Sequence, residues 1–205
     1  MFLLTHSLLA AWLWAIKDTQ YESERDPMEE FMLTLRRQPT PTTEAMQNGI
    51  DFEELVTAIV TNEHRAEGHG TQDQHKWYGA AVKVASEVSG GQLQYKAKKS
   101  MTIAGTDVLL YGRLDVLKAG TIYDIKFSKR YERGKYIDST QHPVYLELIP
   151  EASSFTYLIS NGIDVWTETY RRDETKSIIP TIETFFEWLD SMGLTEEYRK
   201  AWAVK

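Results

Sequence analysis

The sequence predicts an α/β sandwich in which a mixed central sheet is flanked by helices. Hydrophobic residues recur at helical spacing up to about residue 89, and residues 92–127 then alternate with period two and are rich in aromatic and β-branched side chains. The resulting order is helix, three strands, helix, strand. A length of 205 residues fits one domain, with a helical lead-in over residues 1–42, a core over 44–170 and C-terminal helices over 177–205.

Individual elements follow from local signals. Leu9, Trp12, Leu13 and Ile16 lie at i, i+3, i+4 and i+7 spacing and predict the first helix. Further helices are expected over residues 27–37, 44–62, 74–89, 141–148 and 178–191. Strands are expected over residues 92–98, 102–117, 121–127, 154–160 and 164–170. We expect Thr140 to be the N-cap of the helix over 141–148.

Composition excludes several classes of site. The chain has no cysteine, so disulfides, thiolate zinc sites, cysteine nucleophiles and cysteine-held iron–sulfur clusters are excluded. The formal charge of −7 gives no global attraction to nucleic acid, although a local basic surface remains possible. The longest apolar stretch, residues 8–16, is about half the length of a membrane span, and residues 1–18 lack a basic leader. We expect a cytoplasmic protein without a membrane partner.

Residues 112–127 form the most informative stretch and predict a β-hairpin. With Ala119 and Gly120 as a two-residue loop, counting outward places Asp115 directly opposite Asp124. Strand alternation then predicts one face with Leu114, Val116, Tyr123, Ile125 and Phe127, and the other with Arg113, Asp115, Asp124 and Lys126.

The charged face of this hairpin has the composition of a metal site. Two carboxylates paired across strands repel each other unless a cation or a proton lies between them. Lys126 lies two residues beyond Asp124 on the same face. Asp115, Asp124 and Lys126 therefore predict a divalent-metal site beside a group that positions a nucleophilic water. The alternative is an amphipathic hairpin whose charged face is solvated.

Two helices offer further groups for this site. Glu53 borders the buried stripe of the helix over 44–62 and can reach inward; the alternative is an acidic residue near a helix start, favoured by the helix dipole. Gln141 and Tyr145 are four residues apart on one helix face. The alternative for this pair is one hydrogen-bonding side chain beside a packed aromatic ring.

Together, four motifs resemble those of the PD-(D/E)XK nuclease superfamily, most closely its RecB-like and bacteriophage exonuclease branch. That family carries G-x-x-x-(E/H), G-x-x-D, (D/E)-x-K and Q-x-x-x-Y in this order. The corresponding segments are Gly49-Ile-Asp-Phe-Glu53, Gly112-Arg-Leu-Asp115, Asp124-Ile-Lys126 and Gln141-His-Pro-Val-Tyr145. The resemblance covers about residues 44–162.

The resemblance implies a restriction-endonuclease-like αβββαβ core with a helical N-terminal extension, and one or two bound Mg²⁺ or Mn²⁺ ions. It implies that Lys126 orients or helps to deprotonate the attacking water, and that Gln141 and Tyr145 hold this lysine and the DNA strand. An iron–sulfur cluster, which some members of the branch carry on four cysteines, is excluded here. The implied metal ligands are Glu53, Asp115, Asp124 and the Ile125 carbonyl.

Basic residues near this site predict a phosphate track despite the acidic total. They are Lys96, Lys98, Lys99, Lys126, Lys129, Arg130, Arg133 and Lys135. Tyr131 and Tyr136 lie among them and are candidates for stacking on unpaired bases; the alternative is a solvated basic loop. Few phosphate contacts give salt-sensitive binding, so a homo-oligomer, or a recombinase or single-strand-binding partner, would help to retain DNA. His64, His69 and His75 are expected in a solvated loop.

The function expected from these features is hydrolysis of DNA phosphodiester bonds, most simply by an exonuclease acting on ends or single strands in recombination, repair or phage DNA processing. The alternatives are a structure-selective or restriction-like endonuclease, and a non-catalytic DNA-binding or assembly module on the same fold. Retention of Glu53, Asp115, Asp124 and Lys126 argues against the last.

Overall fold

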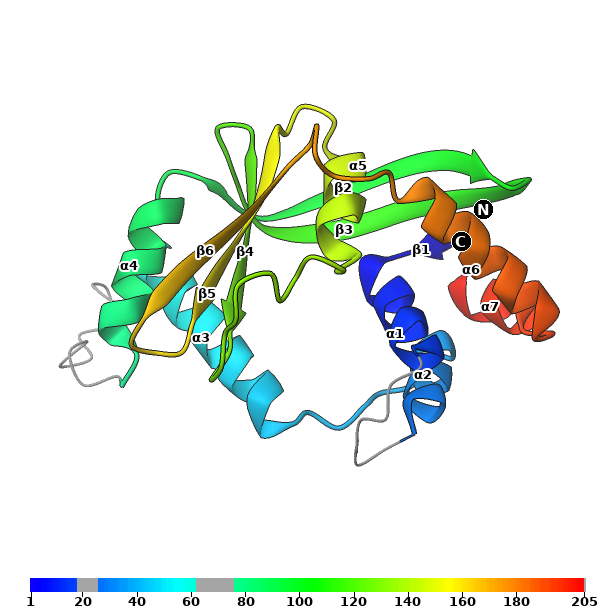
Figure 1. Cartoon of the computed structure of the whole chain (residues 1–205), viewed down its shortest axis with the longest axis horizontal. Helices are drawn as coiled ribbons and strands as arrows, with labels where there is room; N and C mark the ends of the chain where they lie inside the picture. Colours follow the sequence, from blue (N-terminus) through cyan, green and yellow to red (C-terminus); the bar gives the residue numbers. More distant parts are fainter. Residues whose placement is uncertain (18–25, 62–75, 205) are drawn as a thin grey trace.

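The computed structural model describes residues 1–17, 26–61 and 76–204, which form a mixed six-stranded sheet flanked by helices (Figure 1). This arrangement confirms the predicted α/β class. The strands are β1 (Phe2–Leu4), β2 (Gln92–Ile103), β3 (Thr106–Lys118), β4 (Thr121–Phe127), β5 (Ser154–Ser160) and β6 (Val165–Arg171). The helices are α1 (His6–Ile16), α2 (Pro27–Leu35), α3 (Glu44–Thr61), α4 (Tyr78–Val88), α5 (Gln141–Leu148), α6 (Ile179–Ser191) and α7 (Thr195–Trp202).

Strand β3 organises the sheet because its two edges have different partners. Antiparallel β2 follows one edge along nearly its whole length. The other edge is shared: parallel β1 pairs with residues 108–110, and antiparallel β4 pairs with residues 116–118. Among the described strands, none pairs with residues 111–115 on this second edge. The sheet therefore has a gap in one ladder, between the end of β1 and the end of β4.

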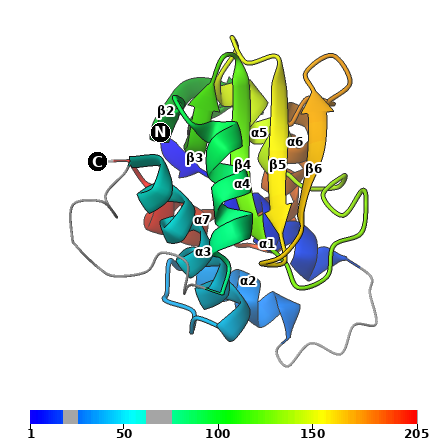
Figure 2. The ribbon, with the colours of Figure 1, turned by 90° about the vertical axis from the view of Figure 1, so that its left-hand side faces the viewer.

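Two layers of helices cover the sheet (Figures 1 and 2). Helices α3 and α4 pack on one face, where Phe52, Val56 and Val84 are buried against Val116 and Leu158. Helix α5 lies on the opposite face, and α1, α2, α6 and α7 complete a larger core beneath the projecting end of β2 and β3. The buried stripe expected for α3 is confirmed, with Glu53 beside it and half-buried.

The register of the β3–β4 hairpin is confirmed from the turn to Val116 and Tyr123, but the face predicted for Leu114 is wrong. Leu114 packs in the core beneath α5, whereas Val116 packs beneath α3 and α4. The change occurs across Gln94 and Asp115, which face each other between two paired positions of the β2–β3 ladder. Gln94 has φ of 50°, so the paired strands turn sharply here and the simple alternation of faces is broken.

Two other expectations about strands are corrected. Residues 102 and 103 belong to β2 rather than to β3, because Ala104 and Gly105 form a tight turn with φ of 48° and 74°. The lead-in is not entirely helical, since residues 2–4 form β1. Within the described residues no helix is long and apolar enough to cross a membrane.

The start of α5 differs in detail from the expectation. Thr140 occupies the N-cap position, but its hydroxyl donates to the carbonyl of His6 at 3.1 Å instead of capping the helix. Ser139 Oγ accepts the hydrogen bond from the Gln141 N–H at 3.2 Å. The first turn of α5 is thereby tied to the start of α1, and this contact brings the N-terminal segment to the gap in the sheet.

Candidate active site

Asp124 and Gln141 form the buried centre of the site. Asp124 lies on β4, is 3% exposed, and accepts at Oδ1 a hydrogen bond from Nε2 of Gln141 on α5. Its second oxygen, Oδ2, lies 2.7 Å from the Lys126 ammonium in an ion pair. Asp124 and Lys126 therefore share a face, as the hairpin pattern predicts.

Asp115, in the unpaired stretch of β3, is the third charged residue of the site. The β3–β4 pairing runs from the turn to Val116 and Tyr123 and ends there, so Asp115 is not a direct ladder partner of Asp124. Its Oδ2 instead accepts a hydrogen bond from the Ile125 N–H at 2.8 Å. Burial, followed by the charges of Asp124 and Glu53, raises the pKa of Asp115 well above its ordinary value. The charges of Asp115, Asp124 and Glu53 therefore act on one another, as predicted. Asp115, however, contacts the backbone N–H of Ile125 instead of pairing with Asp124 across the ladder.

Glu53 reaches the site from α3 but is held by a residue that the sequence did not single out. Nε2 of Gln94, on β2, donates to Glu53 Oε1 at 2.8 Å. Gln94 is also the residue opposite Asp115, so one side chain links the helix to the strand distortion. Polar residues are ordinary in a strand that alternates between polar and apolar positions, so nothing in the sequence distinguishes Gln94 from its neighbours.

Tyr145 has a backbone partner in the ladder gap. Its hydroxyl donates to the Arg113 carbonyl at 3.0 Å, and burial is the main reason that its pKa rises to about 12. Its ring lies against Gly112, where an added Cβ would be 2.3 Å from Cε1 of the tyrosine. The sequence placed Gln141 and Tyr145 on one helix face; in the structure they contact Asp124 and Arg113, and Lys126 pairs with Asp124.

The charge state of Lys126 limits what it can do. Burial lowers its pKa, but the nearby Asp124 and Asp115 carboxylates outweigh burial and the pKa is raised above its ordinary value. The amine therefore remains an ammonium ion at neutral pH. In this state it can donate hydrogen bonds to a water molecule or a phosphate oxygen, and it cannot accept a proton.

His6 is a further neighbour of the site that sequence reasoning missed. It begins α1, lies T-shaped to Tyr145 with ring centroids 5.5 Å apart, and is half-buried. Burial, followed by the charge of Lys126, lowers its pKa to about 4, so the imidazole is neutral at pH 7. The available signal was its position after Thr5, which is the N-cap of the first helix.

The loop between β4 and α5 is fastened by Glu168 of β6. This buried carboxylate accepts hydrogen bonds from the Tyr131 and Tyr170 hydroxyls and from the backbone N–H groups of Gly134 and Tyr136. Burial raises the pKa of Glu168, but these bonds outweigh it and the pKa is lowered. The carboxylate is therefore ionised and holds the loop against the sheet.

The two tyrosines proposed for base stacking are both engaged within the protein. Tyr131 donates to Glu168 and lies 5.4 Å from the Trp166 ring, and Tyr136 stacks on Tyr157 with centroids 4.4 Å apart. Some of the expected basic track is also paired: Lys99 with Glu147 at 2.7 Å, and Lys129 with Glu44 at 3.0 Å. His64, His69 and His75 lie outside the described residues.

The acidic side chains of the site offer the type of donor atom that a hard divalent cation prefers. Asp124, Asp115 and Glu53 supply carboxylate oxygens, the ligands that Mg²⁺ and Mn²⁺ prefer, and Asp124 Oδ2 has the Lys126 ammonium as its partner. In the described parts of the chain, no three or more His, Asp or Glu side chains are grouped closely enough to hold a metal ion. Lys126 occupies the position beside Asp124, and Gln94 holds Glu53.

Comparisons with known proteins add little to this geometry. No protein-family model matches the chain, and no curated protein does. A solved structure described as the crystal structure of SSO0001 is similar with a TM-score of 0.44 and 15% identity, covering 66% of this chain and 75% of that chain.

Proposed function

We propose that this protein is a metal-dependent nuclease of the PD-(D/E)XK type that hydrolyses DNA phosphodiester bonds, acting as an exonuclease on DNA ends. The observation that carries the proposal is the meeting of Asp115, Asp124 and Lys126 at the gap in the β3 ladder, with Gln141 bonded to Asp124. Three of the four motifs supply these groups. The element order α3, α4, β2, β3, β4, α5, β5 supports a restriction-endonuclease-like core.

The metal would be held by Asp115, Asp124 and Glu53 with the Ile125 carbonyl. When bound, Mg²⁺ or Mn²⁺ supplies positive charge to the phosphate and lowers the pKa of a coordinated water. Burial is the main reason that the pKa of Asp115 is raised, and the charges of Asp124 and Glu53 raise it further; a bound cation would relieve this second effect.

The chain's own residues account for the other requirements of hydrolysis. The Lys126 ammonium donates hydrogen bonds that orient the attacking water or a phosphate oxygen. Gln141 fixes one oxygen of Asp124, which leaves the other directed toward Lys126. The water oxygen forms a bond to phosphorus and its proton passes to bulk water, while the bond from phosphorus to the leaving sugar oxygen breaks and that oxygen takes up a proton from bulk water. The negative charge that develops on the phosphate lies beside this ammonium.

The decisive experiment compares linear with covalently closed DNA in Mg²⁺, Mn²⁺ or chelator. The proposal predicts degradation of the linear molecule only, and only with metal. Cleavage of closed circles would assign an endonuclease instead. Absence of any metal-dependent cleavage, together with DNA binding that Lys126→Ala leaves unchanged, would assign a non-catalytic binding module.

A further inference from the structure

Two basic side chains face each other across the β2–β3 ladder, next to the candidate active site. The register pairs Lys96 of β2 with Arg113 of β3, and both side chains are exposed. Like charges directly opposite on neighbouring strands destabilise a sheet, since their Cβ atoms lie only about 5 Å apart. In the parts of the chain that the structure describes, neither side chain forms an ion pair. An anion between the two cations would relieve this repulsion.

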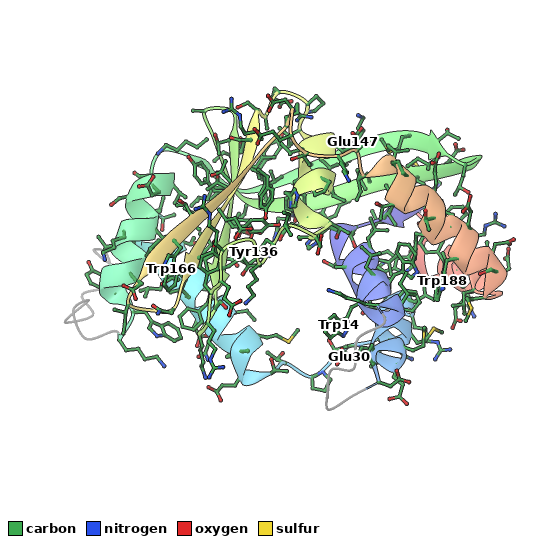
Figure 3. All side chains as sticks on the ribbon, in the orientation of Figure 1. Trp14, Glu30, Tyr136, Glu147, Trp166 and Trp188 are labelled. Atoms are coloured by element: carbon green, nitrogen blue, oxygen red, sulfur yellow. The ribbon has the colours of Figure 1, made fainter. Side chains whose placement is uncertain are left out.

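Lys96 projects from the face of the sheet on which α3 lies. Its neighbours Tyr95 and Ala97 pack in the core beneath α5, and successive side chains of a strand point to opposite faces. Lys99 also lies on the α5 side, where its ammonium pairs at 2.7 Å with Glu147, which is labelled in Figure 3. Lys96 therefore points away from α5 and from this carboxylate.

Arg113 projects from the same face as Lys96. Leu114 is buried in the core beneath α5, and the ring of Tyr145 on α5 lies against Gly112. Arg113 lies between these two residues of β3, so its side chain points away from α5. Only its carbonyl is engaged on that side, by the Tyr145 hydroxyl at 3.0 Å. The guanidinium therefore remains on the exposed face beside Lys96.

This cation pair is adjacent to the proposed metal ligands in both strands. On β3, Asp115 follows Arg113 by two residues. On β2, Gln94 precedes Lys96 by two residues and bonds Glu53 of α3 at 2.8 Å. Two residues of a strand span about 7 Å, which is comparable with the distance between successive phosphates of an extended nucleic-acid strand. An anion held by the pair would therefore lie about one phosphate away from the carboxylates of the candidate site.

We propose that Lys96 and Arg113 form a phosphate site, which holds the phosphate next to the cleaved one in the same DNA strand. The assignment rests on the proposed nuclease function and adds a pair of residues that position the substrate. Lysine and arginine are the usual partners of phosphate groups in protein–DNA complexes. Because such contacts reach the backbone and not the base edges, the site fixes the position of the strand without selecting its sequence.

The test is the binding of a short single-stranded oligonucleotide by Lys96→Gln, Arg113→Gln and the double variant, in Mg²⁺ on the cleavage-impaired Lys126→Ala background. Each single variant should weaken binding about three- to tenfold. Each should also reduce the slope of log affinity against log salt by about 0.7, the value for one phosphate of a single strand. Since both cations hold one phosphate, the double variant should reduce the slope little further. Lys200→Gln, at an exposed lysine of α7, should change neither quantity.

A methylphosphonate scan then locates the phosphate, because each modified oligonucleotide carries one neutral linkage. The linkage next to the cleaved one is identified from the first product that the wild type releases. Its neutralisation should weaken binding to the Lys126→Ala protein and leave binding to the double variant unchanged. The thermal midpoints of the variants should be unchanged or higher, since the substitutions remove a repulsion between facing charges. Weaker DNA binding then cannot result from loss of the fold.

Three results would contradict the phosphate site. An unreduced salt slope in the double variant, or an equal effect of every neutral linkage in both proteins, would overturn it and leave the nuclease proposal standing. Self-association of Lys96→Gln with unchanged DNA binding would assign the pair to protection of the β2 edge instead. If the protein neither binds nor cleaves any DNA, the nuclease function and the phosphate site fail together.

Discussion

The side-chain amide of Gln141 on α5 donates to Oδ1 of Asp124 on β4, and both residues are almost fully buried. This bond joins a helix to the strand that precedes it in sequence and orients the carboxylate at the centre of the site. The remaining oxygen of Asp124 is thereby directed to Lys126, which lies 2.7 Å away.

Gln141→Leu should therefore damage both the fold and the site. The replacement removes the donor and leaves a buried carboxylate oxygen unsatisfied, a loss of about 1–3 kcal/mol in the free energy of unfolding. We expect Mn²⁺ binding and cleavage to weaken as well. Urea unfolding and calorimetric titration measure these effects.

The matched control is Gln47→Leu. Gln47 donates to Asp51 at 2.7 Å, also from a side-chain amide to a carboxylate, but on the exposed surface of α3. Its loss should change the free energy of unfolding by less than about 0.5 kcal/mol. Equal effects at the two glutamines would contradict the role given to burial.

The two motif glycines, Gly112 and Gly49, should respond to alanine in opposite directions. A Cβ at Gly112 would lie 2.3 Å from Tyr145 and 2.9 Å from Leu148, so α5 must move and carry Gln141 with it. We expect a loss of about 1–3 kcal/mol and impaired cleavage. At Gly49, in α3, nothing lies within 4 Å of the added Cβ, and alanine should stabilise by about 0.5–1 kcal/mol. Thermal unfolding of both variants checks the pair, and a stable, active Gly112→Ala would refute the close contact.

Local chemistry explains which parts of the architecture could be predicted from sequence. Ala119 and Gly120 have φ of 48° and 75°, as a two-residue hairpin turn requires, so the register of β3 and β4 followed from counting. The helical spacing of Phe52 and Val56 likewise placed Glu53 at the border of the buried face.

The remaining features depend on contacts between distant segments. Strand β1 has only three residues and pairs with β3 about a hundred residues later, so no local pattern announces it. The positive φ of Gln94 moves Leu114 to the other core, and nothing in an alternating strand signals a left-handed glutamine. His6 follows β1, which pairs with residues 108–110 of β3, and this pairing places the start of α1 beside Tyr145.

Acid should destabilise the protein partly through His142. This buried ring stacks on Tyr170 at 3.9 Å, and burial lowers its pKa from 6.5 to about 4. Between these two pH values the unfolded chain binds a proton that the folded protein does not. The contribution of His142 to the free energy of unfolding is therefore fully present above pH 6.5. It is lost as the pH falls toward 4, by at most about 3 kcal/mol.

His142→Phe keeps a flat ring against Tyr170 and removes this titration. Urea unfolding at pH 7 and pH 4.5 should show a smaller pH-dependent loss in the variant than in the wild type. Part of the loss should remain, because the pKa of His6 is lowered to about 4 in the same way. If the variant and the wild type lost the same free energy of unfolding between pH 7 and pH 4.5, His142 would have to be protonated in the folded protein as it is in the unfolded chain.

Glu168→Ala should release the loop between β4 and α5. The substitution leaves the Gly134 and Tyr136 N–H groups and two tyrosine hydroxyls without their acceptor. Hydrogen exchange over residues 128–139 should accelerate, and DNA binding should weaken if the basic residues of this loop contact phosphate. Glu174→Ala, on the surface after β6, serves as the control and should leave both measurements unchanged. Wild-type exchange in Glu168→Ala would show that other contacts hold the loop.

Substitutions at Lys126 and Asp115 should separate the positioning of the attacking water from the binding of the metal. Lys126→Ala removes the ammonium beside Asp124 but retains every carboxylate, so Mn²⁺ binding should persist while cleavage falls by at least about a hundredfold. Asp115→Ala removes a proposed ligand, and both metal binding and cleavage should be lost. Lys126→Arg keeps a cation with a different shape and distinguishes charge from placement. Calorimetric Mn²⁺ titration and single-turnover cleavage of linear DNA provide the two readouts. Cleavage by Lys126→Ala at the wild-type rate would exclude the assigned role, because hydrolysis would then proceed without the Lys126 ammonium.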